Sequence, residues 1–409
     1  MQRRIAALAL VCFCAGQIGR AQEFKLLNRT VQVHGFFSQG FVKTDENNWL
    51  TMNTSQGSFA ATDMGLNLSS QVTDRFHVGA QVYDRNLGQL GQWHPALDWA
   101  VADYRFANWF GIRAGKVKTT FGLNNDSQDL DFLRVFALLP QGVYPTDLRD
   151  ATIAHTGGDL YGTLSLPDRL GEVSYTAFAG HRSDSVYSGY PYLTQQWGVF
   201  FRKVTGLQYG GDLRWNTPIK GLMLGVSRMN QDITGAGSAL NPRLSPPALM
   251  PYQVSTKAYW SNQYYGEYGW RKLHIDAEYL RNFNRAPPYP GSDLSSDVRA
   301  WYVSGSFHVA KHLELGSYYS RYTQTYVTGG PVSAILPTQT DPALPKNHIY
   351  DRVVAARVDL NRLVYVKAEA HFMDGYGFGP YPDGFYPQQN SVGFEPNTNA
   401  LVLKTGFHF

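Results

Sequence analysis

Cysteine is almost absent from the sequence, which has only Cys12 and Cys14 among its 409 residues. Both lie in an N-terminal segment that we predict to be removed, so the mature chain has no thiol for a disulfide or a thiolate metal site. Charged residues are also scarce, at 17% of the chain. The removed segment holds three arginines and no acid, so the formal net charge falls from +4 to +1. This balance excludes the basic surface that nucleic-acid binding requires.

The N-terminal segment has the pattern of a secretory signal peptide. Two arginines precede an apolar run from Ile5 to Gly16, and small residues flank Arg20. Such a pattern predicts cleavage after Ala21. The alternative is an uncleaved anchor, but the run is much shorter than the ~20 apolar residues that a spanning helix needs. We therefore expect a signal peptide at 1–21 and a single domain at 22–409.

Long hydrophobic runs and familiar catalytic motifs are also lacking. No stretch approaches 18 apolar residues, so the sequence predicts no transmembrane helix. It contains no Gly-x-Ser-x-Gly, no His-Glu-x-x-His and no P-loop. The glycine-rich stretch 375–379 is not followed by a predicted helix, which excludes a dinucleotide site. We expect no catalytic residue, no metal site and no cofactor.

Aromatic residues, in contrast, are abundant at 14% of the chain, and apolar residues alternate with polar ones. The last segment, for example, alternates Leu401, Leu403, Thr405 and Phe407 with Val402, Lys404, Gly406 and His408. Successive side chains of a strand point to opposite faces, so this period of two predicts strands with one apolar and one polar face. The polar faces carry Lys, Arg, Glu and His as well as Ser and Thr.

Sixteen segments show this alternation, at about 29–41, 60–72, 75–86, 96–107, 109–120, 151–165, 171–181, 205–216, 220–231, 252–267, 270–283, 297–309, 312–326, 348–361, 363–373 and 397–409. Seven short links alternate with eight long ones. A soluble β-sandwich would also alternate, but strict alternation of link length and charged polar faces favour a transmembrane β-barrel. We expect an all-β, antiparallel barrel of about 16 strands, with short periplasmic turns, long extracellular loops and a water-filled lumen.

Two neighbouring segments, 97–106 and 110–122, resemble the strand pair that leads into the constriction loop of Gram-negative porins, including phosphate-selective relatives. The following 28 residues and the return through 157–162 are similar to that layout. Phe409, with Phe407 two residues before it, resembles the end signal that the outer-membrane assembly machinery recognises. The resemblance implies a homotrimer in the Gram-negative outer membrane, in contact with lipid and lipopolysaccharide, that passes small hydrophilic solutes passively.

In that family the third long loop folds into the barrel and narrows it, and here this loop is 121–150. Its charged residues are Asp126, Asp129, Asp131, Arg134, Asp147, Arg149 and Asp150. The alternation places these basic residues on the inner wall: Arg105, Arg113, Arg214, Arg357 and Lys367. The loop charges either line the pore, form structural ion pairs with the wall, or cap a short helix at about 126–136. Inner acids nearly balance the inner bases, so we expect mild ion selectivity at most.

Two lysines do not fit the alternation. Lys116 and Lys118 share parity with the outward-facing Ile112, so either Gly115 marks a bulge that changes the register or both lysines lie above the lipid band. We favour the bulge and include both lysines in the pore lining.

Alternative functions remain open. The aromatics near strand ends are typical of interfacial girdles, although rings along the lumen would suit a sugar path. The barrel could also be a surface receptor or adhesin that binds through its loops, or an outer-membrane hydrolase with a site at the rim. We expect a porin and not an enzyme.

Overall fold

The computed structural model describes residues 22–26, 29–167, 170–196, 198–241, 245–256, 258–286, 293–329, 341–377 and 386–409. The predicted signal peptide, with both cysteines, lies outside the described residues. Within those ranges, no helix is long and apolar enough to cross a membrane.

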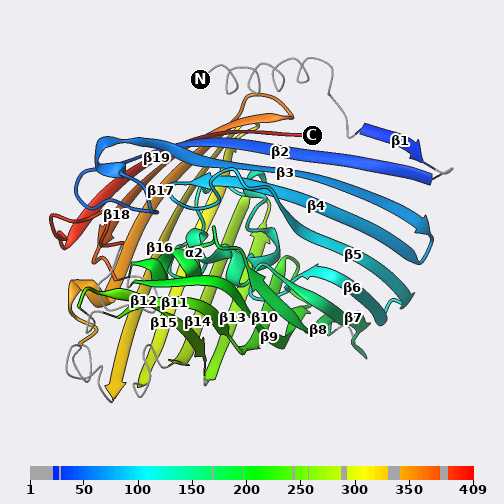
Figure 1. Ribbon diagram of the computed structural model, residues 1–409. Helices are drawn as coiled ribbons and strands as arrows, with labels where there is room; N and C mark the ends of the chain where they lie inside the picture. Colours follow the sequence, from blue (N-terminus) through cyan, green and yellow to red (C-terminus); the bar gives the residue numbers. More distant parts are fainter. Residues whose placement is uncertain are drawn as a thin grey trace.

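Sixteen strands form one closed antiparallel barrel (Figure 1). They are β2 (Arg29–Thr44), β3 (Ser58–Thr73), β4 (Phe76–Leu87), β5 (Ala96–Ala107), β6 (Phe110–Lys118), β7 (Ala154–Ser165), β8 (Glu172–Asp184), β9 (Val199–Asn216), β10 (Leu222–Gln231), β13 (Ala258–Trp270), β14 (Leu273–Ala286), β15 (Asp293–Ala310), β16 (Leu313–Gly329), β17 (His348–Asp359), β18 (Val364–Asp374) and β19 (Asn397–His408). Each of the sixteen predicted strands is confirmed. The predicted segment 252–267 begins too early, because β13 starts at residue 258.

The barrel closes where β19 pairs with β2, with Leu403 opposite Phe41 and Phe407 opposite Phe37. Closure leaves no free sheet edge, and lipid offers no partner to an unpaired backbone group. The ring of Phe409 lies against Gly35, where an added Cβ would come within 2.6 Å of the ring. Glycine at position 35 therefore makes room for the terminal aromatic ring.

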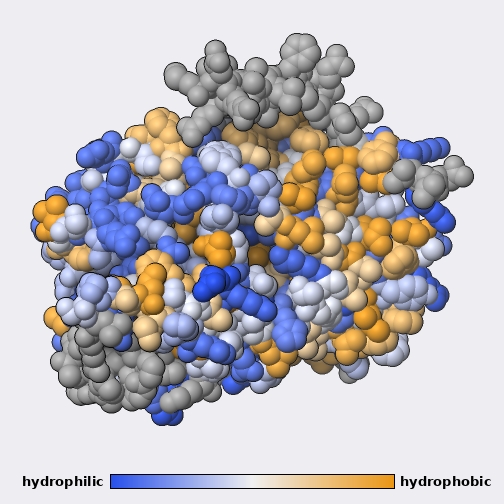
Figure 2. Space-filling model, in the orientation of Figure 1, coloured by the Kyte–Doolittle hydropathy of each residue, from blue (hydrophilic) through white to orange (hydrophobic). Residues whose placement is uncertain are grey.

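The two faces of the strands differ as the alternation predicts. Apolar side chains exposed on the outer face include Val354, Val366, Phe372, Leu401 and Leu403. Their neighbours on the inner face are buried, and several of them are charged, such as Lys367 and Glu369. Figure 2 shows hydrophobic side chains gathered on its right side, over the strands, and a mostly hydrophilic left end where the long loops lie. The apolar side chains form an outer coat, not a single core.

Short turns join the strands at one end, which we call the turn end, and longer loops lie at the other, the loop end. The loop end holds structure that the sequence analysis missed. A helix, α2 (Gly189–Gln195), lies between β8 and β9, and a hairpin of β11 (Thr234–Asn241) and β12 (Ala248–Ser255) lies between β10 and β13. A short strand, β1 (Gln22–Leu26), pairs with the start of β2.

Candidate functional site

The loop between β6 and β7, residues 119–153, lies inside the barrel and is here called the inner loop. It includes the predicted constriction loop 121–150. Its residues bond to inner-face side chains of strands on all sides, including Gln81 of β4, Asp98 of β5, Glu278 of β14 and Lys367 of β18. The inner loop therefore crosses the interior and narrows it, as the resemblance implied.

One anchor of the inner loop is an ion pair with β5. Both terminal nitrogens of Arg149 donate to the Asp98 carboxylate at 2.9 Å, and both side chains are about 5% exposed or less. The guanidinium carbon also lies 4.2 Å from the centre of the Tyr83 ring. Paired, bidentate contacts of this kind fix position as well as charge. Arg149 was predicted to line the pore, but its side chain is only 4% exposed, so it is largely out of contact with water.

A second anchor joins the inner loop to β18 and β19. The Asp131 carboxylate lies 2.9 Å from Lys404 Nζ and accepts a hydrogen bond from the Tyr365 hydroxyl. Lys367 Nζ donates to the backbone oxygens of Asp131 and Phe136 at 2.6 and 2.8 Å. Burial alone would raise the pKa of Asp131, but Lys404 and Lys367 outweigh it and hold this pKa below its ordinary value. Asp131 is thus a charged structural tie.

Two carboxylates of the wall bind backbone amides of the inner loop. Glu369 Oε2 accepts from the amides of Ala137 and Leu138 at 2.9 and 3.1 Å. Glu278 Oε1 accepts from the amide of Leu123 at 2.6 Å. These contacts satisfy buried donors that the irregular loop would otherwise leave unpaired. Their inward direction follows from the alternation, but their partners could not be read from it.

Two further predicted wall residues also hold the loop. Arg214 donates to Asp212 at 3.0 Å and to the backbone oxygen of Gly122 at 3.0 Å. Arg357 donates to Asp359 at 2.8 Å and to the backbone oxygen of Arg134 at 3.2 Å. Each arginine thus pairs with an acid on its own strand and with the inner loop.

The predicted acids at the start of the loop lie near Lys118. Its ammonium donates to Asp129 Oδ1 at 2.7 Å and to the backbone oxygen of Asp126 at 2.9 Å. Burial raises the pKa of Asp126, against the attraction of nearby Arg214 and Lys118. The ammonium of Lys118 therefore lies against the inner loop.

The explanation offered for these lysines is wrong. Pairing of β6 with β7 continues without an inserted residue across Gly115. Instead of forming a bulge, Gly115 adopts a φ of +128°, which only glycine adopts easily. Lys116 donates to the backbone oxygen of Leu97 on β5.

Two other predicted residues also lie away from the inner loop. Arg113 forms an ion pair with Asp159 at 2.9 Å on the neighbouring strand. Arg105 is exposed near the turn end, with its guanidinium carbon 5.9 Å from the centre of the Tyr161 ring. Of the twelve predicted residues, nine therefore lie in the inner loop or bond to it, whereas Arg105, Arg113 and Lys116 have their contacts with neighbouring strands of the wall.

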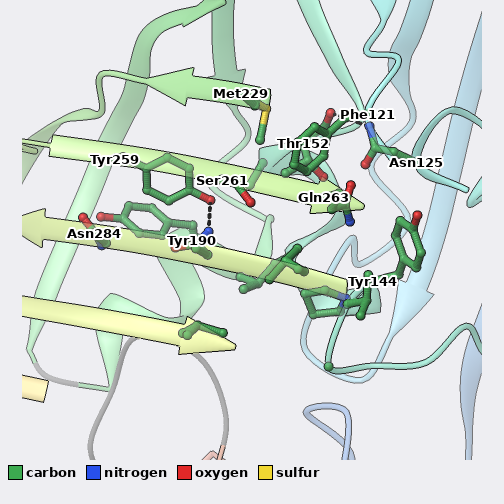
Figure 3. A pocket seen from close by; sticks show the side chains of 18 of the residues that line it. Phe121, Asn125, Tyr144, Thr152, Tyr190, Met229, Tyr259, Ser261, Gln263 and Asn284 are labelled. Atoms are coloured by element: carbon green, nitrogen blue, oxygen red, sulfur yellow. Dashed lines mark hydrogen bonds between the residues drawn. The ribbon is translucent and has the colours of Figure 1, made fainter. Parts of the chain in front are cut away.

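Several cavities border the inner loop, and the two largest lie at the turn end and at the loop end. The turn-end cavity, of about 550 Å³, lies between the inner loop and β13–β17. Its charged lining residues are Arg134, Arg271, Lys272, Arg357, Glu267, Asp276, Glu314 and Asp359, with His274 and His308. The loop-end cavity, of about 160 Å³, has a mainly neutral lining of aromatic, amide and aliphatic side chains (Figure 3).

One buried arrangement has the order of a nucleophile, a base and an acid. His155 Nδ1 lies 3.0 Å from the Thr119 hydroxyl, and its Nε2 lies 2.9 Å from Asp159 Oδ1. The Thr119 hydroxyl also accepts from Gln208 at 2.9 Å. Thr119 and His155 are fully buried, so no substrate reaches the hydroxyl and the geometry does not favour hydrolysis.

Among the described residues, one group combines a histidine with two carboxylates at metal-ligand distances. Ligand atoms of Glu267, His274 and Asp276 lie within 4.8 Å of one another on the lining of the turn-end cavity. His274 Nε2 is only 2.7 Å from Asp276 Oδ1, so these two side chains are explained as an ion pair without a metal.

Comparison with known proteins finds likeness in structure alone. No family model and no curated protein sequence matches the chain. The structure is similar to OmpT, an outer membrane protein of Vibrio cholerae, with a TM-score of 0.57 and 14% identity over 95% of this chain and 100% of that chain. It is also similar to an anion-selective porin from Comamonas acidovorans, with a TM-score of 0.55 and 11% identity over 93% and 100% of the two chains. The outer membrane channel DcaP of Acinetobacter baumannii gives a TM-score of 0.53 and 11% identity over 94% and 99%.

At these identities the likeness shows the fold. The predicted resemblance is confirmed at that level: the chain has the closed, sixteen-stranded barrel of the outer-membrane porins, with its third long loop folded inside.

Proposed function

We propose that this chain is a porin of the Gram-negative outer membrane, through which small hydrophilic solutes and ions diffuse passively. The observation that carries the proposal is the inner loop, which crosses a closed barrel and is anchored to several sides of its wall. An inner loop with a catalytic role would need a nucleophile that a substrate can reach. An inner loop that narrows a channel needs only to be held rigidly in place. The anchors supply that rigidity.

The charges around the turn-end cavity support a channel of at most mild ion selectivity. Four arginine or lysine side chains and four carboxylates line it. Strong selectivity comes from rings or clusters of one sign. Arg134 and Arg357 are the predicted pore-lining residues that border this cavity, and we propose that they tune the ion preference. The other predicted residues near the inner loop act mainly by holding it.

The proposed location and partners rest on the barrel surface. We propose a homotrimer in the outer membrane, reached with a cleaved signal peptide and with Phe409 recognised by the assembly machinery. The outer coat would contact the lipid bilayer. On the same face, the guanidinium carbons of Arg228 and Arg281 lie 5.5 Å from the centre of the Trp260 ring. Arginines at the edge of an apolar band suit the phosphates of lipopolysaccharide.

Reconstitution into planar bilayers tests the porin proposal. A porin gives stepwise, ohmic current increments as single molecules insert. Protein that inserts, as judged by co-flotation with lipid vesicles, yet gives no conductance would overturn the proposal.

A surface receptor or adhesin is the second candidate, and the β11–β12 hairpin favours it. The hairpin exposes Leu240, Leu249 and Met250 by 43%, 56% and 47% of their side chains. Exposed apolar side chains in a loop mark contact surfaces. Deleting 234–255 and joining the strands with a short Gly-Ser link would abolish partner binding and leave conductance intact if the chain is a receptor. If the chain is a porin with no receptor role, the deletion should leave conductance unchanged and there is no partner binding to lose.

A further inference from the structure

The loop-end cavity has the properties of a binding site. It lies between the inner loop and β13–β15, and residues of the loop end, Tyr190 of α2 and Ile233, complete its lining. One water needs about 10–15 Å³ on the same measure, so about 160 Å³ holds on the order of ten waters. That volume suits a solute of one or two sugar rings and excludes long chains.

Two side chains of β13 lie on the cavity lining with unpaired polar atoms. Ser261 and Gln263 are each 1% exposed. The Ser261 hydroxyl and both polar atoms of the Gln263 amide have no hydrogen-bond partner. Leaving one such group buried and unpaired costs about 1–3 kcal/mol, and buried polar groups in proteins are generally paired. These atoms are therefore placed to bond a molecule in the cavity.

The unpaired atoms select hydroxyl groups as partners. An amide side chain offers two donor hydrogens and an acceptor oxygen, and a serine hydroxyl both donates and accepts. A sugar or polyol hydroxyl has the same dual character, so one ligand group can bond an amide donor and a hydroxyl acceptor together. The side chain of Asn284 adds a further unpaired oxygen on the lining.

Aromatic rings lie at both ends of this polar stretch. Figure 3 shows Tyr190 and Tyr259 on one side of Ser261 and Gln263, and Phe121 and Tyr144 on the other. The Tyr259 hydroxyl accepts a hydrogen bond from Asn282 at 2.7 Å, which fixes the ring. Aromatic faces provide apolar, polarisable surfaces against which the C–H faces of a sugar ring pack. Apolar walls with a few oriented polar groups are typical of small-molecule sites.

The cavity carries no unneutralised charge among its lining residues. Arg182 is the charged residue of the lining, and its guanidinium donates to both oxygens of the Asp184 carboxylate and to Gln231 at 3.0 Å. A carboxylate or phosphate ligand would need a free cation, and an ammonium ligand a free carboxylate. A neutral ligand needs neither.

We propose that the loop-end cavity binds a neutral, polyhydroxylated solute of one or two sugar rings, with Ser261 and Gln263 bonding its hydroxyls and the tyrosine rings packing on its C–H faces. The proposal rests on the proposed porin function only for the solute's route to the cavity. It makes the barrel a channel with a sugar-binding step beside its constriction.

Saturation-transfer difference NMR on the detergent-solubilised protein tests binding without requiring conductance. D-glucose and maltose are the neutral probes, and gluconate and glucosamine are the charged ones. We expect saturation transfer to a neutral probe, at least tenfold weaker binding of both charged probes, and at least tenfold weaker sugar binding by Gln263→Leu. The control Asn262→Leu lies one residue away and faces outward, where Asn262 accepts from Arg228 at 3.1 Å. It should bind as the unmodified protein does.

No transfer to either sugar, equal binding of the charged probes, or unchanged binding by Gln263→Leu would each overturn the proposal. If Gln263→Leu does not assemble, as judged by heat-modifiable migration in gels, Ser261→Ala takes its place with the same expected direction. Planar-bilayer conductance separates the two proposals. Conductance without sugar binding refutes the site alone, and sugar binding without conductance refutes the porin alone.

Discussion

The ion pair between Arg149 and Asp98 gives the sharpest test of how the inner loop is held. We consider Asp98→Asn, which keeps the size of the side chain and removes its charge. Arg149 is 4% exposed; the asparagine oxygen can still accept from one guanidinium nitrogen, but Arg149 loses the second contact of 2.9 Å and the negative charge of its partner. Removing one partner of a buried ion pair destabilises the folded arrangement by about 3–5 kcal/mol. Asp150 and Asp129 remain at 3.7 and 3.8 Å from the guanidinium, so the lower end of that range applies.

A cost of about 3 kcal/mol shifts the ratio of attached to released loop by roughly 100-fold. Because the sixteen-stranded barrel does not depend on this pair, we expect the variant to assemble. Limited trypsin digestion should then cut after Arg134 or Arg149 far faster than in the unmodified protein. Single-channel recordings should show larger and noisier conductance steps.

The matched control is Asp103→Asn, on the same strand and the same face, where the Tyr161 hydroxyl on β7 donates to Asp103. It should leave both digestion and conductance unchanged. The double variant Asp98→Asn, Arg149→Gln should recover part of the loss, because it leaves no buried charge unpaired. Equal protease resistance and equal noise in Asp98→Asn and the control would refute this account of the loop.

Three further predictions concern pH, ion preference and assembly. Burial raises the pKa of Asp147 to about 6, although the Tyr386 hydroxyl donates to it. The folded protein therefore holds this proton more tightly than the unfolded chain does. The free energy of unfolding should fall by up to about 3 kcal/mol as pH rises from 4 to 7. Over this pH range the apparent melting temperature of Asp147→Asn should fall less than that of the unmodified protein. Arg134→Gln removes a cation from the turn-end cavity, so the reversal potential in a salt gradient should shift towards cation preference. Phe409→Ala removes the terminal ring that packs on Gly35, and we expect at least a several-fold loss of heat-modifiable protein in outer-membrane fractions.

Each of these has a matched control. Asp103→Asn should keep the pH dependence of the unmodified protein, and an identical pH profile in Asp147→Asn would contradict the assigned pKa. Arg105→Gln removes a cation that lies away from the inner loop and should shift the reversal potential less than Arg134→Gln does. For assembly, Phe372→Ala removes an outward aromatic ring from β18; an equal loss in both variants would show that the terminal position has no special role.

Local patterns in the sequence were sufficient to predict the strands of the barrel. A period of two fixes which face of a strand is apolar, and short turns fix which strands are neighbours. The closing pair β19–β2 follows because a barrel in lipid leaves no edge. The hairpin β11–β12 and helix α2 were missed because Gly, Pro and polar residues in 182–204 and 232–251 resemble ordinary loops.

The roles of the charged residues were harder to predict, because strand alternation gives a direction but no partner. Lys367 and Arg113 both face inward, yet one is covered by the inner loop and the other pairs with Asp159 on the wall. The conformation of Gly115 could not be predicted from the alternation either. Its φ of +128° and the unbroken register depend on its neighbours in the sheet.

The sequence by itself determined a closed barrel of sixteen strands with an apolar outer face, because strand period and turn length are local properties. Only the tertiary structure decided which charges are neutralised, because the contacts that neutralise them join distant parts of the chain. Tyr365 and Asp131, for example, are 234 positions apart and meet only when the loop enters the barrel. The same folding brings Ser261 and Gln263 opposite the inner loop, where their unpaired polar atoms border the loop-end cavity.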